Sequence, residues 1–211
     1  MGGPAKPVPP KPKRLPKLPT WLERARRMIL EPTREWAAIA GEFTSAGPIY
    51  GRFLVPMAAI GPVASTVGAL VSGERSSLFT LGDTYPVSRM DALTSGVLEY
   101  GLNLLAVWVL ALVIELLAPA FGGQQNRVQA LKVSAYGSTP YWLGGALALF
   151  PKLAPIGTLL GFYSVWLFAL GLPTVMKAPR DKTAAYMVLV SVGGIIIGLL
   201  MGALSQLFVG R

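Results

Sequence analysis

Five long apolar runs, separated by short polar links, fill most of the chain after Phe53 and restrict its fold more than any other feature. The hydrocarbon core of a bilayer is roughly 30 Å thick, so about 20 helical residues cross it. Each run is close to that length or longer, and lipid solvates such a segment better than water does. The sequence therefore predicts an all-α membrane protein with five transmembrane helices. The predicted spans are residues 53–71, 96–119, 133–150, 153–176 and 183–209.

Composition narrows the chemistry that these helices can support. Of the 211 residues, 53% are hydrophobic and 14% charged, which leaves room for one membrane domain and little else. The chain has no Cys and no His, so it lacks thiolates, the commonest metal ligand and the usual general base. It also has no P-loop and no Gly-rich dinucleotide turn. We expect no enzyme activity, no cofactor and no metal site.

The N-terminal region divides into two parts before the membrane domain, which we assign to residues 47–211. Residues 1–19 hold seven prolines among Lys and Arg, and such a segment is disordered or forms polyproline II. This tail either tethers the chain to anionic lipid or only solubilises it. Residues 20–46 show apolar side chains at helical spacing, which predicts interfacial amphipathic helices. We expect Arg24, Arg26 and Arg27 to contact the lipid surface.

Basic residues are distributed unevenly between the two sides that five spans would create. Fifteen of the 19 Lys and Arg fall on the side of the N-terminus and four on the other. This asymmetry predicts a cytoplasmic N-terminus and an external C-terminus. The basic N-terminal region adjoins a span and has no nucleic-acid-binding motif, so we expect lipid and not nucleic acid as its partner.

Ionisable residues within the spans need a partner or a purpose, because burying them in lipid costs a few kcal/mol each. Glu115 lies near the inner end of the second run, and Arg127 and Lys132 lie near the inner end of the third. The short link between the runs favours a structural ion pair with either cation over a proton site.

Glu99 and Asn103 lie one helical turn apart near the outer end of the second run. A carboxylate beside an amide could bind a cation or a proton, and the alternative is a carboxylate that reaches surface water. Arg89 or Lys152 could reach Glu99 from the outer loops.

Glycines recur at four-residue intervals in the last run, at Gly194, Gly198 and Gly202. Such a stripe lets another helix approach closely. We favour packing within the chain over self-association, with Gly157 and Gly161 of the fourth run as the mate.

Three stretches resemble the Yip family of polytopic membrane proteins, particularly its short bacterial members. They are ILEPTREWAAIAGE (Ile29–Glu42), AFGGQQNRVQALKVSAYGSTPYW (Ala120–Trp142) and LFALGLPTVMKAPRDKTAAY (Leu167–Tyr186). The resemblance implies a five-helix fold with a cytosolic N-terminus in the inner membrane. Eukaryotic relatives act in vesicle traffic and contact Rab GTPases through longer N-terminal regions. This chain lacks the Asp-Leu-Tyr-Gly-Pro type box of those regions, so Rab binding is not carried over.

Two hypotheses about function follow. The leading one is a non-enzymatic membrane protein that organises the bilayer or scaffolds a partner, which could be another membrane protein or a second copy of the chain. The rival is a small transporter or channel, whose path would be lined by Glu99, Asn103 and the kinks expected at Pro140 and Pro173.

Overall fold

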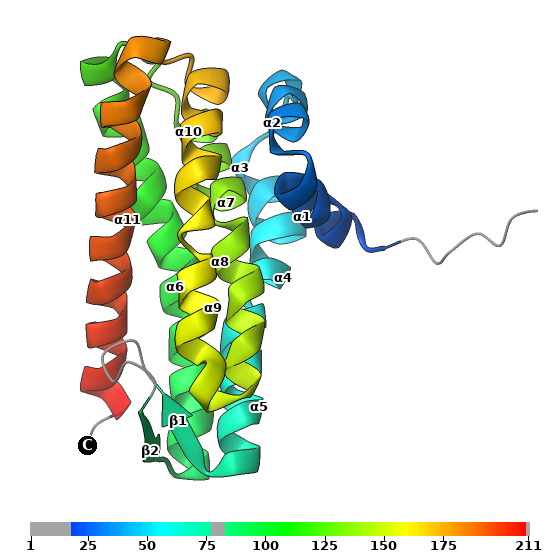
Figure 1. The fold of residues 1–211 in the computed structure, drawn as a ribbon, viewed down its shortest axis with the longest axis vertical. Helices are drawn as coiled ribbons and strands as arrows, with labels where there is room; N and C mark the ends of the chain where they lie inside the picture. The colour runs from blue at the N-terminus through cyan, green and yellow to red at the C-terminus, as the bar shows by residue number, and fades with distance from the viewer. Residues whose placement is uncertain (1–17, 77–82, 210–211) are drawn as a thin grey trace, which may run out of the picture.

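The computed structural model describes residues 18–76 and 83–209, so nearly all of the tail predicted for residues 1–19 lies outside the described residues. The helices of the described residues form a short N-terminal pair and five columns that run up and down side by side (Figure 1). The N-terminal pair is α1 (Thr20–Leu30) and α2 (Pro32–Gly41). The columns are, in order: α3 (Ala46–Ile49), the π-helical turn η1 (Tyr50–Leu54), α4 (Val55–Ala58) and α5 (Ile60–Ser72); α6 (Arg89–Leu117) and the 3-10 turn η3 (Ala118–Phe121); α7 (Arg127–Gly137), α8 (Thr139–Gly144) and η4 (Gly145–Leu149); η5 (Pro151–Leu153), α9 (Ala154–Leu160) and α10 (Tyr163–Val175); and α11 (Arg180–Val209).

Four of these columns contain a helix long and apolar enough to cross a membrane. They are Ala46–Ser72, Arg89–Phe121, Pro151–Val175 and Arg180–Leu207. The third column, which carries the span predicted at residues 133–150, is interrupted at Ser138 between α7 and α8. Pro140 follows in the first turn of α8, where its missing N–H costs least. Turns also occur in the first column at Ala59 and in the fourth at Gly161 and Phe162, yet both remain candidate spans. The structure thus supports an all-α membrane fold with four candidate spans and, besides them, the broken third column.

Two helices begin earlier than the apolar runs predicted, because polar caps start them. The side chain of Ser88 accepts a hydrogen bond from the backbone N–H of Asp91 at 3.1 Å and starts α6. Asn126 accepts one from the N–H of Gln129, also at 3.1 Å, and starts α7. Such caps supply acceptors for the free N–H groups of a first turn. Hydropathy alone does not detect these polar first turns.

A small β-hairpin, absent from the predicted fold, lies at the end of the bundle opposite the N-terminal pair (Figure 1). Strand β1 (Glu74–Ser76) pairs antiparallel with β2 (Thr84–Pro86). Gly73 ends α5 with φ of 73°, a left-handed conformation that glycine adopts without steric cost. The turn sends β1 back across the end of the bundle and so determines where Arg75 lies.

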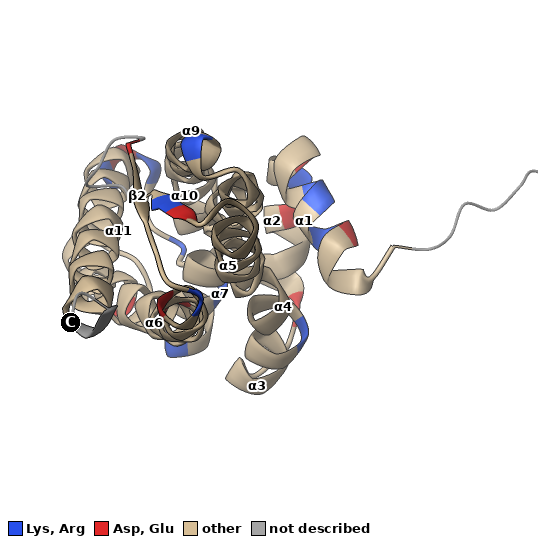
Figure 2. Ribbon diagram, turned by 90° about the horizontal axis from the view of Figure 1, so that it is seen from below, with Lys and Arg blue, Asp and Glu red and all other residues tan. Residues whose placement is uncertain are grey.

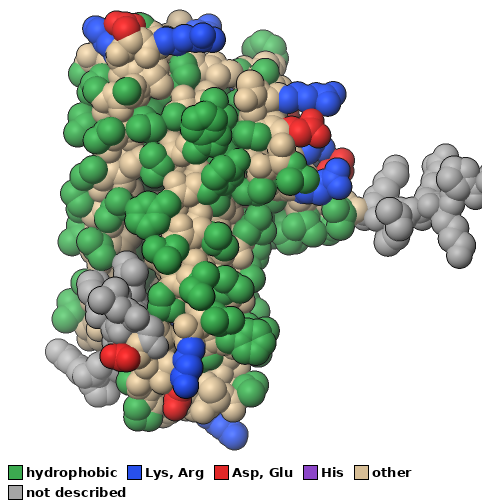
Figure 3. Space-filling model, in the orientation of Figure 1, with side chains coloured by type: hydrophobic (Ala, Val, Ile, Leu, Met, Phe, Trp, Pro, Cys, Tyr) green, Lys and Arg blue, Asp and Glu red, His purple; other side chains and the backbone are tan. Residues whose placement is uncertain are grey.

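Seen from the β-hairpin end, α11 lies on one side of the bundle and the N-terminal pair on the other (Figure 2). α11 packs on α6 and α10, and α10 also contacts α2 and α7. In the space-filling view, apolar side chains cover the length of the visible face and charged ones gather toward the two ends (Figure 3). An apolar belt between charged ends is the surface that a bilayer solvates. The chain is an integral membrane protein.

The glycines pack differently from the prediction. A Cβ atom on Gly144 would lie 2.2 Å from the carbonyl oxygen of Gly157, so α8 and α9 meet backbone to backbone. Gly157 therefore packs against α8 of the third column and not against α11. Gly194 faces Leu110 of α6, whereas a Cβ on Gly198 would meet nothing within 4 Å. Within the described residues, the stripe of α11 that includes half-buried Gly202 is only partly covered.

Candidate functional site

The N-terminal hairpin, which we define as α1 and α2 with Glu31 between them, is docked on the side of the bundle. Ala25 and Met28 of α1 and Trp36 of α2 are fully buried. A Cβ on Gly171 of α10 would lie 2.8 Å from the Trp36 ring, so the absent side chain makes room for the indole. The apolar stripe that predicted an interfacial helix is thus covered largely by the protein itself, and the hairpin is part of the fold.

Arg24 connects the hairpin to the bundle. Its guanidinium forms a two-pronged ion pair with Glu42, in which Nη1 donates to Oε2 at 2.8 Å and Nη2 donates to Oε1. The same group lies over the ring of Tyr136 in α7, 5.1 Å from its centroid. The hydrogen bonds that Arg24 donates hold the pKa of Glu42 below its usual range, and the same hydrogen bonds raise the pKa of Arg24. Both groups are charged at neutral pH.

A second set of ion pairs closes the hairpin on itself. Arg27 donates from Nε to the buried carboxylate of Glu35 at 2.7 Å and from Nη1 to Glu23 at 3.0 Å. Glu35 also lies 3.4 Å from Nε of Arg24. Arg24 and Arg27 are therefore paired with carboxylates of the hairpin and with Glu42 directly after it, contrary to the lipid contact expected of them. Arg26 is exposed, and within the described residues it forms no ion pair.

Lys132 anchors the C-terminal end of α2. Its side chain is buried, and Nζ donates to the carbonyl oxygens of Ile39 at 2.9 Å and Glu42 at 2.7 Å. The last carbonyls of a helix have no partner within it, so a cation that binds them satisfies both the hydrogen bonds and the helix dipole. Lys132 does not join the pair expected with Glu115, because it is occupied here. Arg127 alone reaches Glu115, with Nε 3.0 Å from Oε2.

We call the contact region between the hairpin and the bundle, around Trp36 and Lys132, the junction. The three stretches that carry the family resemblance converge there. The first contributes α2 with Trp36, the second contributes α7 with Lys132, and the third contributes α10 with Gly171. The junction also includes Arg24 and Glu42, which no local sequence pattern marked as partners, since they lie 18 residues apart with the whole of α2 between them. We take this junction as the candidate functional site.

A hollow of about 390 Å³ opens beside the junction. Its walls come from α1, from the link between α2 and α3, from the first column at η1, and from α7. The lining residues are Thr20, Trp21, Glu23, Arg24, Arg27, Glu42, Thr44, Pro48, Ile49, Arg52, Phe53 and Tyr136. The hollow therefore has both charged and apolar walls.

The second predicted polar site, at Glu99, is closed by an ion pair. Arg75 reaches in from β1, with Nη2 2.6 Å from Oε2 of Glu99, and Ser65 donates to the same oxygen at 3.2 Å. The expectation that Arg89 or Lys152 supplies the cation is wrong, because the β-hairpin brings Arg75 there first. Asn103, one turn away, forms no side-chain hydrogen bond in the part of the chain that the structure describes.

Both hollows at the N-terminal hairpin, of about 390 and 350 Å³, are lined without Glu99. The breaks expected to line a path do not open one, since Phe168 packs against Gly137 beside the turn at Ser138 and α10 continues through Pro173 to Val175. Among the described residues, no group of three Asp or Glu side chains is placed to hold a metal ion. These observations favour the N-terminal junction over Glu99 as the functional region.

Comparison with known proteins agrees with the resemblance seen in the sequence. The profile of the Yip1 domain family matches residues 26–202. The inner membrane protein YohC of Escherichia coli strain K12 is 26% identical over 162 residues, which cover 75% of this chain and 82% of the relative. YohC of Escherichia coli O6:H1 strain CFT073 gives the same identity and coverage. No solved structure matches the chain significantly.

Proposed function

The chain belongs to the Yip1 domain family, and we propose that it is a non-enzymatic, five-span protein of the inner membrane that organises the bilayer. The relative YohC is named as an inner membrane protein, which supports this location. In this proposal the broken column α7–α8–η4 is the remaining span, because it runs alongside its neighbours through the bundle (Figure 1). The excess of Lys and Arg on the side of the N-terminus supports a cytoplasmic position for that side in this proposal.

The single observation that carries the proposal is the fixed attachment of the N-terminal hairpin to one side and one end of the bundle. The ion pairs of Arg24 and the hydrogen bonds of Lys132 hold it there, so the described molecule is broader at that end than at the other (Figure 1). A body that is broader in one leaflet acts as a wedge and favours curvature toward its narrow end. Apolar side chains of the hairpin region face outward as well: Leu30 is 66% exposed and Phe43 is fully exposed.

Anionic lipid is the partner that we propose for this surface. Arg26 is free to contact headgroups, and the Lys and Arg of residues 1–19 would add to the attraction, at about 1 kcal/mol for each basic residue near the surface. Scaffolding of another membrane protein or self-association would use the partly covered stripe of α11 at Gly198.

The wedge is tested by reconstituting the purified full-length protein into liposomes of one starting size and measuring vesicle diameters by electron cryomicroscopy. We expect the wild-type protein to reduce the mean diameter relative to empty vesicles. The double variant Leu30→Ser, Phe43→Ser should lose much of this effect. Val71→Ser, which changes a side chain 83% exposed at the opposite end, is the matched control and should retain it. Vesicles of unchanged diameter with wild-type protein would refute the proposal.

The same liposomes test the transport alternative. The ion pair at Glu99 predicts no ion or solute flux above that of empty vesicles. A flux that disappears in Glu99→Gln would replace the proposal with a transporter.

A further inference from the structure

One of the arginines that line the hollow beside the junction forms no ion pair within the described residues. Three arginines line the hollow, and two of them, Arg24 and Arg27, are paired with carboxylates. The third, Arg52, is exposed and forms no ion pair and no hydrogen bond within the described residues. With Glu23 and Glu42 on the walls, the hollow carries three positive and two negative groups. An anion would find an unpaired guanidinium there and two further guanidiniums beside it.

The local backbone places Arg52 in the wall. It lies in the π-helical turn η1, where residues 50–54 follow a wider winding than the α-helix around them. Turns of this kind are rare and occur frequently at functional sites. The next residue, Phe53, is buried, so the turn directs an apolar side chain into the core and the adjacent guanidinium outward.

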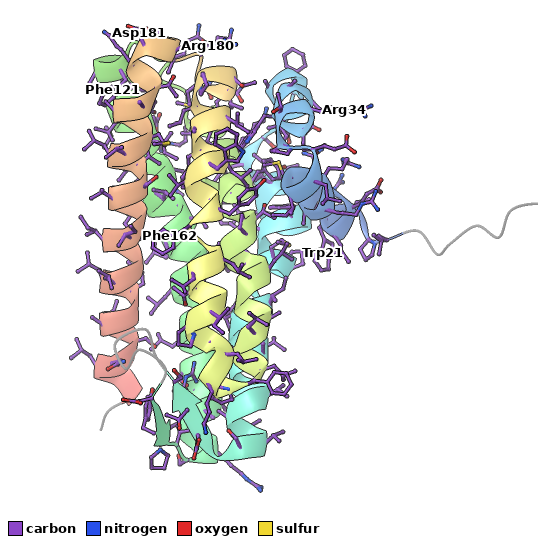
Figure 4. All side chains as sticks on the ribbon, in the orientation of Figure 1. Trp21, Arg34, Phe121, Phe162, Arg180 and Asp181 are labelled. Atoms are coloured by element: carbon purple, nitrogen blue, oxygen red, sulfur yellow. The ribbon has the colours of Figure 1, made fainter. Side chains whose placement is uncertain are left out.

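The remaining walls suit the boundary between headgroup and acyl chain. Arg52 stands just before the apolar run of the first span, and Trp21, half-buried in α1, lines the same hollow. Figure 4 shows Trp21 at the lower edge of α1, away from the charged side chain of Arg34. Tryptophan is enriched at this level of the bilayer because its ring is amphipathic. A soluble anion has no apolar part that could pack against the wall formed by Trp21, Pro48 and Ile49.

We propose that this hollow binds the phosphate of an anionic phospholipid, with Arg52 as its principal ligand and Arg24 and Arg27 beside it. The acyl chains would lie along the outer face of the first column below the hollow, where Val55 is exposed. This inference rests on the proposed position of the hairpin at the cytoplasmic headgroup level. The inference goes beyond the proposed function because it assigns the lipid to one defined site, whereas the proposed function needs only a diffuse attraction between basic residues and headgroups. The basic tail of residues 1–19 is a poor occupant, because its charge has the same sign as that of Arg52.

The experiment measures lipid binding to the purified full-length protein in neutral detergent by native mass spectrometry. Short-chain phosphatidylglycerol is the probe, short-chain diacylglycerol lacks the phosphate, and glycerol phosphate lacks the acyl chains. We expect saturable binding of one phosphatidylglycerol that is weakened about tenfold or more in Arg52→Gln, the size expected for a lost charge-assisted hydrogen bond. Arg52→Lys, which keeps the charge, should fall between the two. Arg34→Gln, which removes an exposed arginine of the hairpin outside this hollow, is the matched control and should bind as the wild type does.

Each alternative has a distinct result. Equal weakening in Arg52→Gln and Arg34→Gln would mean diffuse attraction and would overturn the site. Binding of glycerol phosphate as tight as that of phosphatidylglycerol would overturn the lipid as ligand. Unchanged binding in Arg52→Gln would overturn the role of that residue. The vesicle diameters described above report on the wedge separately, so failure of the lipid site with an intact diameter effect would leave the proposed function standing.

Discussion

Replacing Gly144 with alanine tests the closest contact between two columns of the bundle. The new Cβ would lie 2.2 Å from the carbonyl oxygen of Gly157 and 3.2 Å from Cβ of Leu160. Ordinary van der Waals contact begins at 3.4 Å, so α8 and α9 must part by about 1 Å. The obstacle is backbone, which cannot rotate away as a side chain can. Gly144 has φ of −58° and ψ of −33°, so alanine causes no strain in its own backbone.

The cost of this separation can be isolated by comparison with Gly198→Ala in α11. A Cβ at Gly198 meets nothing within 4 Å, so that variant reports only the helix preference of alanine, at most about 1 kcal/mol. Overpacking of a tight contact costs about 1–3 kcal/mol. We therefore expect Gly144→Ala to be less stable than Gly198→Ala by about 1–3 kcal/mol.

The assay is unfolding of the full-length protein by sodium dodecyl sulfate in mixed micelles, followed by circular dichroism. Gly157→Ala should match Gly144→Ala, because its Cβ would lie 2.2 Å from the carbonyl oxygen of Gly144. The double variant should cost less than the sum of the two, since one separation relieves both clashes. Equal stability of Gly144→Ala and Gly198→Ala would refute the contact between α8 and α9 and, with it, the arrangement of the third and fourth columns.

Three further predictions concern the buried and paired charges. Lys132→Met leaves the carbonyls of Ile39 and Glu42 without a donor and should lower the free energy of unfolding by about 1–3 kcal/mol. Lys152→Met, which changes an exposed lysine, should have little effect in the same assay. The pKa of Glu42 is below its ordinary 4.5 in the folded state, so its pair with Arg24 stabilises the protein above that pH and the contribution is lost as pH falls through the lower folded value. Melting curves of wild type and Glu42→Gln should therefore differ at neutral pH and converge in acid, and a gap that is constant down to strong acid would contradict the pairing. Glu99→Gln should destabilise the protein by roughly 1–3 kcal/mol by leaving Arg75 without its counter-charge, and adding Arg75→Gln should restore part of the loss, which a double-mutant cycle measures.

Local properties of the sequence accounted for much of the fold. The apolar runs located the columns to within a few residues at most of their ends, and helical spacing located the two short helices of residues 20–46. The family resemblance is confirmed. The errors at helix starts came from polar first turns, as at Ser88 and Asn126, where a cap and not hydropathy decides the boundary.

The partners of the charged and small residues could not be predicted in the same way. Lys132 was expected near Glu115, yet it binds carbonyls of α2 that precede it by as many as 93 residues. Arg75 reaches Glu99 only because Gly73 reverses the chain and a strand crosses the end of the bundle. Arg24 was expected at the lipid surface, but it forms an ion pair with Glu42 and lies over the ring of Tyr136.

The sequence by itself determined that the chain enters a bilayer as helices, because the transfer of apolar side chains to lipid and the helical backbone hydrogen bonds are properties of each segment alone. Only the tertiary structure decided which glycines touch, which arginines pair with carboxylates, and that the hairpin is bound to the bundle and not merely lying beside it. Those outcomes depend on a few polar contacts whose strength comes from exclusion of water, and that exclusion arises only after the columns have packed.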